Sequence, residues 1–328
     1  MQFFEIRVNS VITNAPLDFD LFLTVGGKPV LFRKTGDVLT RERVKILFQH
    51  GGEKFLVPLD QRTLYLGSLK KAAHNPENST EEKGKFLKET AFVHVNDLFT
   101  KKDISPVVTE AEGLVEEMVN FLTSDINATS SLMRLSVHDY YTYNHCVDVS
   151  VYSIVLARRI YGDSSKEVLM AAGLGGLLHD IGKRKVDWGI INKKSPLTTD
   201  EWKEVKRHPE YGREFLEEIP AIPDRTKLMV YEHHENFDGT GYPRGLREDQ
   251  ISGLARIVAI ADVFDALTTD RSYHKAVNPK EAMDMMFGMQ PGKFDPDIFQ
   301  SFNKKIKKQT GMEFAPDFDP CQPGRVFK

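Results

Sequence analysis

Residues 171–183 read AAGLGGLLHDIGK, an apolar helical stretch that ends in His179, Asp180 and Lys183. Small residues permit close packing, and the apolar face at helical spacing comprises Leu174, Leu177, Leu178 and Ile181. Charged side chains at the end of such a buried helix are costly unless something neutralises them. A metal ion with an anionic ligand would do so, because imidazole and carboxylate together suit iron, manganese or zinc. The stretch therefore predicts a metal site at the end of a buried helix.

Two further stretches carry side chains of the same kind. His233 and His234 are followed by Glu235 and by the tight loop sequence of residues 238–243, DGTGYP. Residues 255–270 form an apolar helix pattern that Asp262 and Asp265 interrupt. Carboxylates among aliphatic residues again indicate a buried cation, and we interpret Asp265 as a cap or as an acceptor behind a ligand.

A single histidine in a helix is more often a surface residue or a satisfied core residue than a ligand. We apply that interpretation to the histidines without organised neighbours, namely His50, His74, His94 and His138. It does not suit His179, His233 and His234 of the stretches above, nor His145 and His208.

The composition bounds the class of protein. The chain has 328 residues, 41% of them hydrophobic and 28% charged, which fits two domains and a connector. Its net charge of −3 argues against broad binding to nucleic-acid backbones, so we expect no DNA partner. No apolar run is long enough for a membrane span, and the N-terminus lacks a signal-peptide pattern. Cys146 and Cys321 fit no disulfide or metal spacing, and we expect a cytoplasmic protein.

The N-terminal part of the chain is different in character. Residues 1–69 alternate apolar and polar positions and include a helix pattern over 41–50 that Thr40 can cap, which predicts a small α+β domain for regulation or dimerisation. Residues 70–130 are predicted to be a connector, exposed over 74–88 and helical after Pro106. The chain from 131 to 320 has a helical pattern, and residues 321–328 form a tail.

The order of these motifs resembles the HD-GYP branch of the HD phosphohydrolase superfamily. His179-Asp180 with the later Asp262 is similar to the superfamily pattern, and residues 233–243 are similar to the long GYP signature. Supporting matches are Asn192-Lys193, Leu197-Thr198, Glu201, His208-Pro209, Gly212 and Arg271-Ser272-Tyr273. The resemblance covers residues 131–320 and implies a mainly α chain: an all-α HD-GYP bundle preceded by the small α+β domain and the helical connector.

The resemblance also implies a two-metal centre. The first metal would be held by His145, His179, Asp180 and Asp262. Asp180 would bridge to a second metal held by His208, His233 and His234. Iron or manganese is expected, and in such sites ions about 3.5–4 Å apart stabilise the attacking and leaving oxygens while a bridging hydroxide attacks. Some family members hold a third metal with a Glu at the position of Tyr141, and a phenol with a reference pKa of about 10 is a poor substitute, so we expect two metals.

The substrate contacts follow from the same comparison. Asp180 and Lys183 are the predicted catalytic residues, with Lys183 also holding a phosphate oxygen. Arg271 can grip phosphate with two parallel donors. The family often has Lys or Arg at the position of His274, which leaves the second cationic contact open. Tyr242 is expected either to line the substrate pocket or merely to pack in the turn.

The function implied is metal-dependent hydrolysis of cyclic di-GMP to linear pGpG and onward to GMP. Three alternatives stay open: a receptor that holds the dinucleotide without turning it over, a hydrolase of other nucleotides, and an enzyme for mixed cyclic GMP-AMP. The candidate partners are cyclic di-GMP, a second copy of the chain and a diguanylate cyclase with a GGDEF domain.

Overall fold

The computed structural model describes the chain except for residues 53, 126, 135–141, 164, 271–274 and 311–328. By their internal contacts, the residues fall into two compact units. We call residues 1–96 with 120–135 the sheet unit, and residues 97–119 with 136–328 the helical unit. Two helices contribute residues to both units, α3 (Thr80–Thr100) and α4 (Ser105–Ser124).

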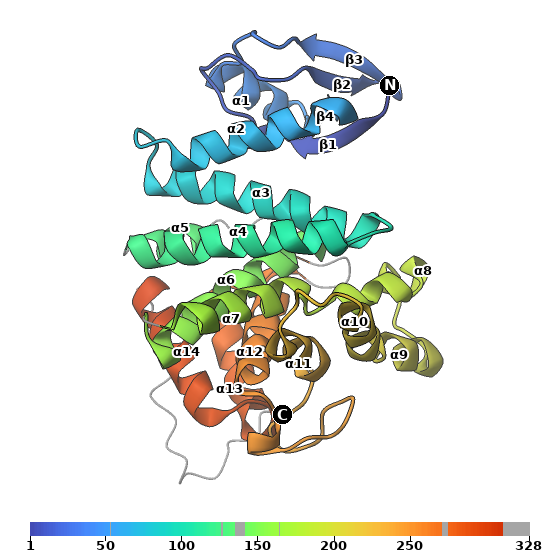
Figure 1. The fold of residues 1–328 in the computed structure, drawn as a ribbon, viewed down its shortest axis with the longest axis vertical. Coiled ribbons are helices and arrows are strands. Elements are labelled where there is room, and N and C mark those ends of the chain that lie inside the picture. Colours follow the sequence, from blue (N-terminus) through green and yellow to red (C-terminus); the bar gives the residue numbers. More distant parts are fainter. Residues whose placement is uncertain (53, 126, 135–141, 164, 271–274, 311–328) are drawn as a thin grey trace. The chain divides into compact units, whose positions relative to one another are not determined.

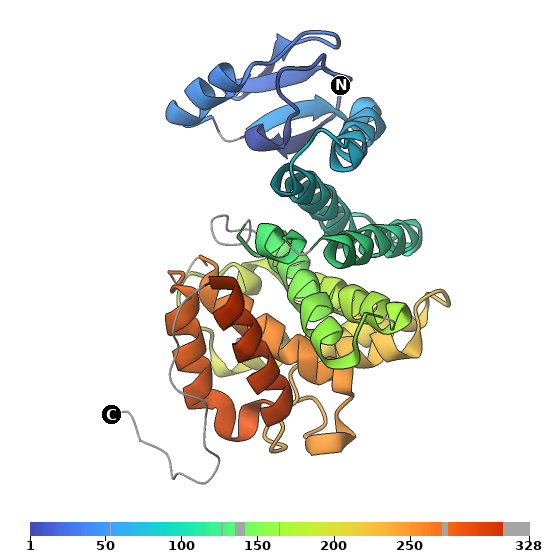
Figure 2. The same cartoon turned by 90° about the vertical axis from the view of Figure 1, so that its left-hand side faces the viewer.

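The sheet unit begins with a four-stranded antiparallel sheet in the order β1-β4-β2-β3. Its strands are β1 (Phe3–Arg7), β2 (Leu21–Val25), β3 (Lys28–Arg33) and β4 (Lys54–Pro58). Short 3-10 turns lie at Val8–Ser10 (η1) and Leu59–Gln61 (η2), and the helices of this part are α1 (Arg41–Gln49) and α2 (Arg62–His74). Tyr65 and Leu69 of α2 join the core formed by Phe55 and Val57 of β4, so α2 covers one face of the sheet (Figure 2).

These elements agree with the patterns in the sequence. The Thr40 hydroxyl accepts a hydrogen bond from Arg43 N–H and caps α1, as expected. The expected exposed connector over 74–88 is wrong in its second half, because α3 begins at Thr80 and buries Phe86, Leu87 and Lys88. The prediction failed because residues 80–85 are polar and carry no apolar spacing that would indicate a helix. After α4, the sheet unit ends with α5 (Ala128–Arg134).

The helical unit is built around α7 (Lys166–Leu178), which packs against α6 (Thr142–Tyr161), α11 (Asp224–Glu232) and α12 (Gly253–Thr268) (Figure 1). Glycine makes this packing close: a Cβ on Gly176 would lie 2.8 Å from the Cα of Ser150 in α6. Its other elements are η3 (Ile181–Lys185), α8 (Trp188–Ile191), α9 (Thr199–Val205), α10 (His208–Glu217), η4 (Glu248–Gln250), α13 (Pro279–Lys293) and α14 (Pro296–Thr310).

Helices α13 and α14 lie side by side and complete the bundle, with α13 against α12 and α14 against α6 (Figures 1 and 2). The mainly α architecture with a small N-terminal α+β part is confirmed. Among the described helices, none combines the length and the apolar character that a membrane span needs.

Candidate metal centre

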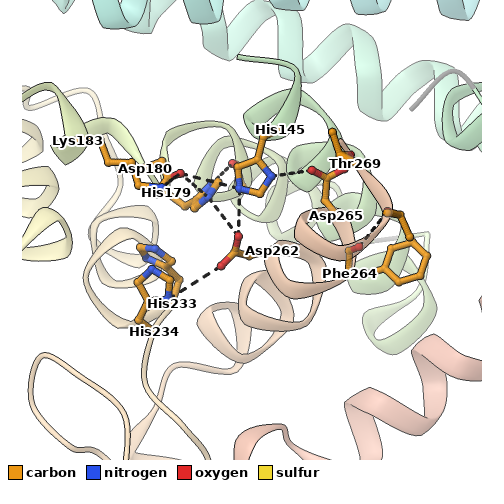
Figure 3. Close-up of polar contacts among 12 residues, drawn as sticks. His145, His179, Asp180, Lys183, His233, His234, Asp262, Phe264, Asp265 and Thr269 are labelled. Atoms are coloured by element: carbon orange, nitrogen blue, oxygen red, sulfur yellow. Dashed lines mark hydrogen bonds and ion pairs between the residues drawn. The ribbon is translucent and has the colours of Figure 1, made fainter. Parts of the chain in front are cut away.

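The helical unit brings the predicted ligands together at one place (Figure 3). We call them the ligand set: His145 in α6, His179 and Asp180 after α7, His208 at the start of α10, His233 and His234 after α11, and Asp262 in α12. Most of these side chains are buried. Residues far apart in the sequence therefore meet because separate helices end or cross at this point.

The local fold orients three of the histidine rings in the same way. In each, Nδ1 lies within hydrogen-bond distance of the backbone carbonyl three residues earlier. The distances are 2.7 Å from His179 to Gly176, 2.7 Å from His208 to Val205 and 2.9 Å from His233 to Val230. Since a carbonyl only accepts, Nδ1 must carry the proton and donate it. A neutral ring then has its lone pair on Nε2, directed at the centre.

His145 is oriented by a carboxylate instead. Its Nδ1 lies 2.6 Å from Oδ2 of Asp265, which is fully buried and also accepts a hydrogen bond from the Thr269 hydroxyl. Carboxylate acceptors behind a metal-bound imidazole fix the ring and raise its basicity. The expected place of Asp265 behind a ligand is thus what the geometry shows.

The arrangement of lone pairs fits a cation at the centre. Nε2 of His208 lies 3.2 Å from Nε2 of His233, and both rings donate through Nδ1. Burial lowers the pKa of His208 to about 4 and that of His233 well below its usual value. At neutral pH each ring therefore carries one proton, on Nδ1, and none on Nε2. The buried Nε2 of His179 has no hydrogen-bond partner among the described residues. Lone pairs that face one another in this way suit a metal ion.

The possible ligand atoms form groups, and the atoms inside each group lie within 4.8 Å of one another. One group is His145, His179 and Asp262, and another is His208, His233 and His234. Asp180 lies between them: its Oδ2 is 3.4 Å from His179 Nε2, and its Oδ1 is 3.3 Å from His208 Nε2. The groups can therefore hold metal ions, with one oxygen of Asp180 facing each.

The carboxylates of the centre are held in their charged form. Burial alone would raise the pKa of Asp180, but the Lys183 ammonium and the rings of His179 and His208 hold that pKa well below its usual range. Burial also opposes ionisation of Asp262, whose pKa the hydrogen bond and charge of His145 keep well below its usual value. Both acids are thus available as anionic ligands.

A cavity of about 870 Å³ opens on the centre. Its lining includes His145, Asp180, His208, His234 and Asp262 of the ligand set. Lys183 also lines it, with Nζ 2.5 Å from Asp180 Oδ2. The ammonium thus lies beside the centre in contact with a ligand carboxylate.

Tyr242 of the GYP sequence lines the same cavity, with its ring centroid 4.8 Å from that of His234. Burial, with the charges of Asp262 and Asp180, raises the pKa of its hydroxyl, which is therefore a neutral donor. The loop that carries Tyr242 is fixed by buried Glu235, whose carboxylate accepts hydrogen bonds from backbone N–H groups of Arg244 and Leu246. The first of the two interpretations of Tyr242, a pocket residue, agrees with this position.

Three predicted positions lie outside the described residues: Arg271, His274 and Tyr141. Trp202 and Lys206, whose ammonium lies near the rings of Trp202 and Tyr242, were not predicted from the sequence. Trp202 of α9 lines the cavity. Its signal in the sequence was an aromatic residue placed between two family matches, Glu201 and His208.

Residues 143–298 match a family model described as HD domain. These residues belong to the HD domain family. The HD-GYP resemblance inferred from the motifs is confirmed. A curated relative, the cyclic di-GMP phosphodiesterase PA4108 of Pseudomonas aeruginosa, is 42% identical over 60% of this chain and 47% of its own length. Another, 3'3'-cGAMP-specific phosphodiesterase 3 of Vibrio cholerae, is 36% identical over 51% of this chain and 35% of its own length.

The chain thus spans less than half the length of these two relatives. A solved structure shares the fold more widely. An HDG"Y"P protein of Bdellovibrio bacteriovorus, Bd1817, superposes with a TM-score of 0.75 over 93% of this chain and 100% of that one, at 23% identity.

Proposed function

We propose that the helical unit of this HD-GYP protein hydrolyses cyclic di-GMP to linear pGpG, and that pGpG can proceed to GMP. The observation that carries the proposal is the position of Asp180, with one carboxylate oxygen facing each of two groups of histidine ligands. Two-metal centres of this kind act on phosphate esters. The names of relatives such as PA4108 support a cyclic dinucleotide as the substrate.

We assign two divalent ions to the ligand set, iron or manganese. His145, His179, Asp180 and Asp262 would hold one, while Asp180, His208, His233 and His234 would hold the other. Mixed imidazole and carboxylate ligands suit these metals. When bound, the ions supply a water of lowered pKa and neutralise charge on the phosphate. The absence of a carboxylate at Tyr141 favours two ions over three.

Residues of the chain itself bind and orient the phosphate. Asp180 faces both groups of histidines, and its contact with Lys183 holds the ammonium beside the centre. There the ammonium can donate a hydrogen bond to a non-bridging phosphate oxygen in place of one to Asp180. Tyr242, which also lines the cavity, offers a neutral hydroxyl. Arg271 and His274 are proposed as further phosphate contacts.

A second candidate substrate is 3'3'-cyclic GMP-AMP. It is favoured by relatives of similar identity whose names specify it, among them phosphodiesterase 3 of Vibrio cholerae. The chemistry at the phosphate would be the same, so the two substrates differ only in what the cavity offers to the bases. A second copy of the chain and a GGDEF protein stay predictions as partners.

The test is a metal count and an assay on the same oxygen-free preparation. We expect about two ions per chain, the number that two-metal phosphoester centres hold, and conversion of cyclic di-GMP to pGpG. Asp180→Ala should lose metal and nearly all activity. The matched control is Asp200→Ala, which removes an exposed carboxylate of α9 that pairs with Lys203. Undiminished activity of Asp180→Ala would refute the proposal, and binding without turnover at full metal loading would favour a receptor.

A further inference from the structure

The lining of the cavity has two chemically different parts. Five members of the ligand set, His145, Asp180, His208, His234 and Asp262, form the polar part together with Lys183. The other part comes from α8, α9, the segment between them and α12. Most of it is apolar, including Ile190, Ile191, Pro196, Leu197, Trp202 and Leu267, and the segment between α8 and α9 adds the polar residues Lys193, Lys194 and Ser195. A phosphodiester would occupy the polar part, and the apolar part would then face whatever the phosphodiester carries.

The rings of Tyr242 and Trp202 lie between the metal centre and this apolar part or within it. The Tyr242 ring lies 4.8 Å from that of His234 at an interplanar angle of 31°. Lys206 Nζ lies 5.3 Å from the centroid of the Tyr242 ring and 5.7 Å from that of the Trp202 ring. One ammonium is therefore shared between two aromatic rings that line the cavity, while Lys206 itself is not one of the lining residues.

Trp202 is only partly covered, with 47% of its surface exposed. Large aromatic side chains are usually well buried, so an indole at the wall of a cavity has area left for a ligand. The other tryptophan, Trp188, is exposed to a similar degree, 45%, but does not line the cavity. Trp188 is thus a natural comparison for the effect of position alone.

We propose that Trp202 is the stacking surface for one guanine of the substrate, and that Lys206 selects guanine there. Every nucleobase can stack on an aromatic ring, so Trp202 supplies affinity without selectivity. Selectivity comes from the ammonium, because guanine presents two acceptors, O6 and N7, on the edge where adenine presents an acceptor and an NH2 donor. Lys206 has no carboxylate partner among the described residues, which leaves its donors to the ligand. The proposal rests on the proposed function and distinguishes its two candidate substrates, each of which carries a guanine, from cyclic di-AMP.

Stacking is tested by fluorescence, because the chain has two tryptophans and each can be observed alone. Trp188→Phe leaves Trp202 as the reporter, and Trp202→Phe leaves Trp188. We expect cyclic di-GMP, mixed rapidly with the metal-loaded protein, to quench Trp202 within the first turnover. Trp188 should not respond. Equal responses of the two reporters, or none from Trp202 while the substrate is turned over, would overturn the proposal.

The contribution of the stack is measured by truncation. Trp202→Ala should raise KM for cyclic di-GMP about 5- to 100-fold, the range found when a stacking aromatic is removed. The value of kcat should change little, since no ligand of the metals is touched. Trp202→Phe should restore most of the affinity, whereas Trp188→Ala should leave KM unchanged. A fall in kcat alone would show a structural role and contradict the inference.

The selective role of Lys206 is tested with Lys206→Met in the Trp188→Phe background. We expect affinity for cyclic di-GMP to fall about tenfold, as for loss of a base-reading contact, and affinity for cyclic di-AMP to fall less than twofold. Lys203→Met, which removes an exposed lysine paired with Asp200, is the control. An equal loss for both dinucleotides would assign Lys206 to phosphate and refute selection. A parent protein that neither binds nor hydrolyses cyclic di-GMP would instead refute the proposed function.

Discussion

At the scale of single residues, the centre depends on which nitrogen of each ring holds the proton. The carbonyls of Gly176, Val205 and Val230 settle this for three histidines through contacts inside their own turns. His145 lies near the start of α6 and uses the side chain of Asp265 instead. Its orientation therefore depends on a contact between two helices, α6 and α12, and a single substitution can remove it.

Asp265→Asn should weaken metal binding without dismantling the domain. An amide is a poorer acceptor than a carboxylate for the Nδ1 proton of His145, 2.6 Å away. Loss of such a partner typically costs 10–100-fold in metal affinity, and we expect a decrease of about that size in competition with a chelator. The control is Asp295→Asn, another buried acid, which pairs with Arg256 away from the centre. Unchanged metal affinity in Asp265→Asn would contradict the role given to Asp265.

The stability of the metal-free protein should fall with pH below about 6.5. Burial lowers the pKa of His208 to about 4 in the folded chain, against an ordinary histidine value of 6.5. Between these values the unfolded chain binds the proton and the folded chain does not, so the free energy of unfolding decreases as pH falls, by about 1.4 kcal/mol per pH unit for this group. Urea unfolding at pH 7, 6 and 5 measures the slope. His208→Gln should make it shallower, and exposed His74→Gln should not.

At the scale of elements, glycines hold the ligand-bearing segments together. A Cβ on Gly182 of η3 would lie 1.9 Å from the carbonyl oxygen of His208 and 2.4 Å from Gly212 N, both backbone atoms of α10. Backbone atoms cannot swing aside as a flexible side chain can. The contact therefore fixes the distance between Asp180 and His208, which is 3.3 Å from Oδ1 to Nε2.

Gly182→Ala should push η3 and α10 apart. We expect a loss of stability of at least about 1–3 kcal/mol, as for overpacked cores, together with loss of the ion held by His208, His233 and His234. Gly288→Ala in α13 is the control, since its Cβ would meet nothing within 4 Å and should be neutral or slightly stabilising. Metal content and urea unfolding of both variants are the measurements. Full metal content in Gly182→Ala would show that η3 and α10 can accommodate the added methyl group without losing the ion, contrary to what their close contact indicates.

The elements also show what sequence can and cannot predict. The apolar helix over 171–178 and the capped helix after Thr40 were predictable because each is a local pattern of spacing and residue type. The full ligand set, with His145 and His208, followed from the resemblance to the HD-GYP family and not from local spacing. Helix α3 was missed at its start because residues 80–85, TEEKGK, contain no large apolar side chain, so no apolar spacing marks the helix there. Trp202 was missed because its place at the cavity depends on how α9 and α12 are arranged around that cavity, and no local pattern encodes the arrangement.

At the scale of the whole molecule, the ligand set ties the helical unit together. Its members come from α6, α10, α12 and the ends of α7 and α11, while the described residues of the sheet unit contribute none. Metal binding should therefore stabilise one unit of the chain and leave the other unchanged. Both tryptophans, Trp188 and Trp202, lie in the helical unit, so their fluorescence reports the unfolding of that unit alone.

Metal removal should lower the melting temperature seen by tryptophan fluorescence. Free metal at 100 times its Kd stabilises the folded unit by about 2.7 kcal/mol, which for a unit of this size is a shift of about 5–10 °C. Hydrogen exchange should slow on metal addition in peptides from α6 to α12 and stay the same in β1 to β4, because only the former carry ligands. Asp180→Ala should abolish both effects, since its carboxylate faces both groups of histidines. A shift that persists in Asp180→Ala would place the stabilising metal elsewhere, and protection that spreads to the sheet would show that metal binding couples the two units.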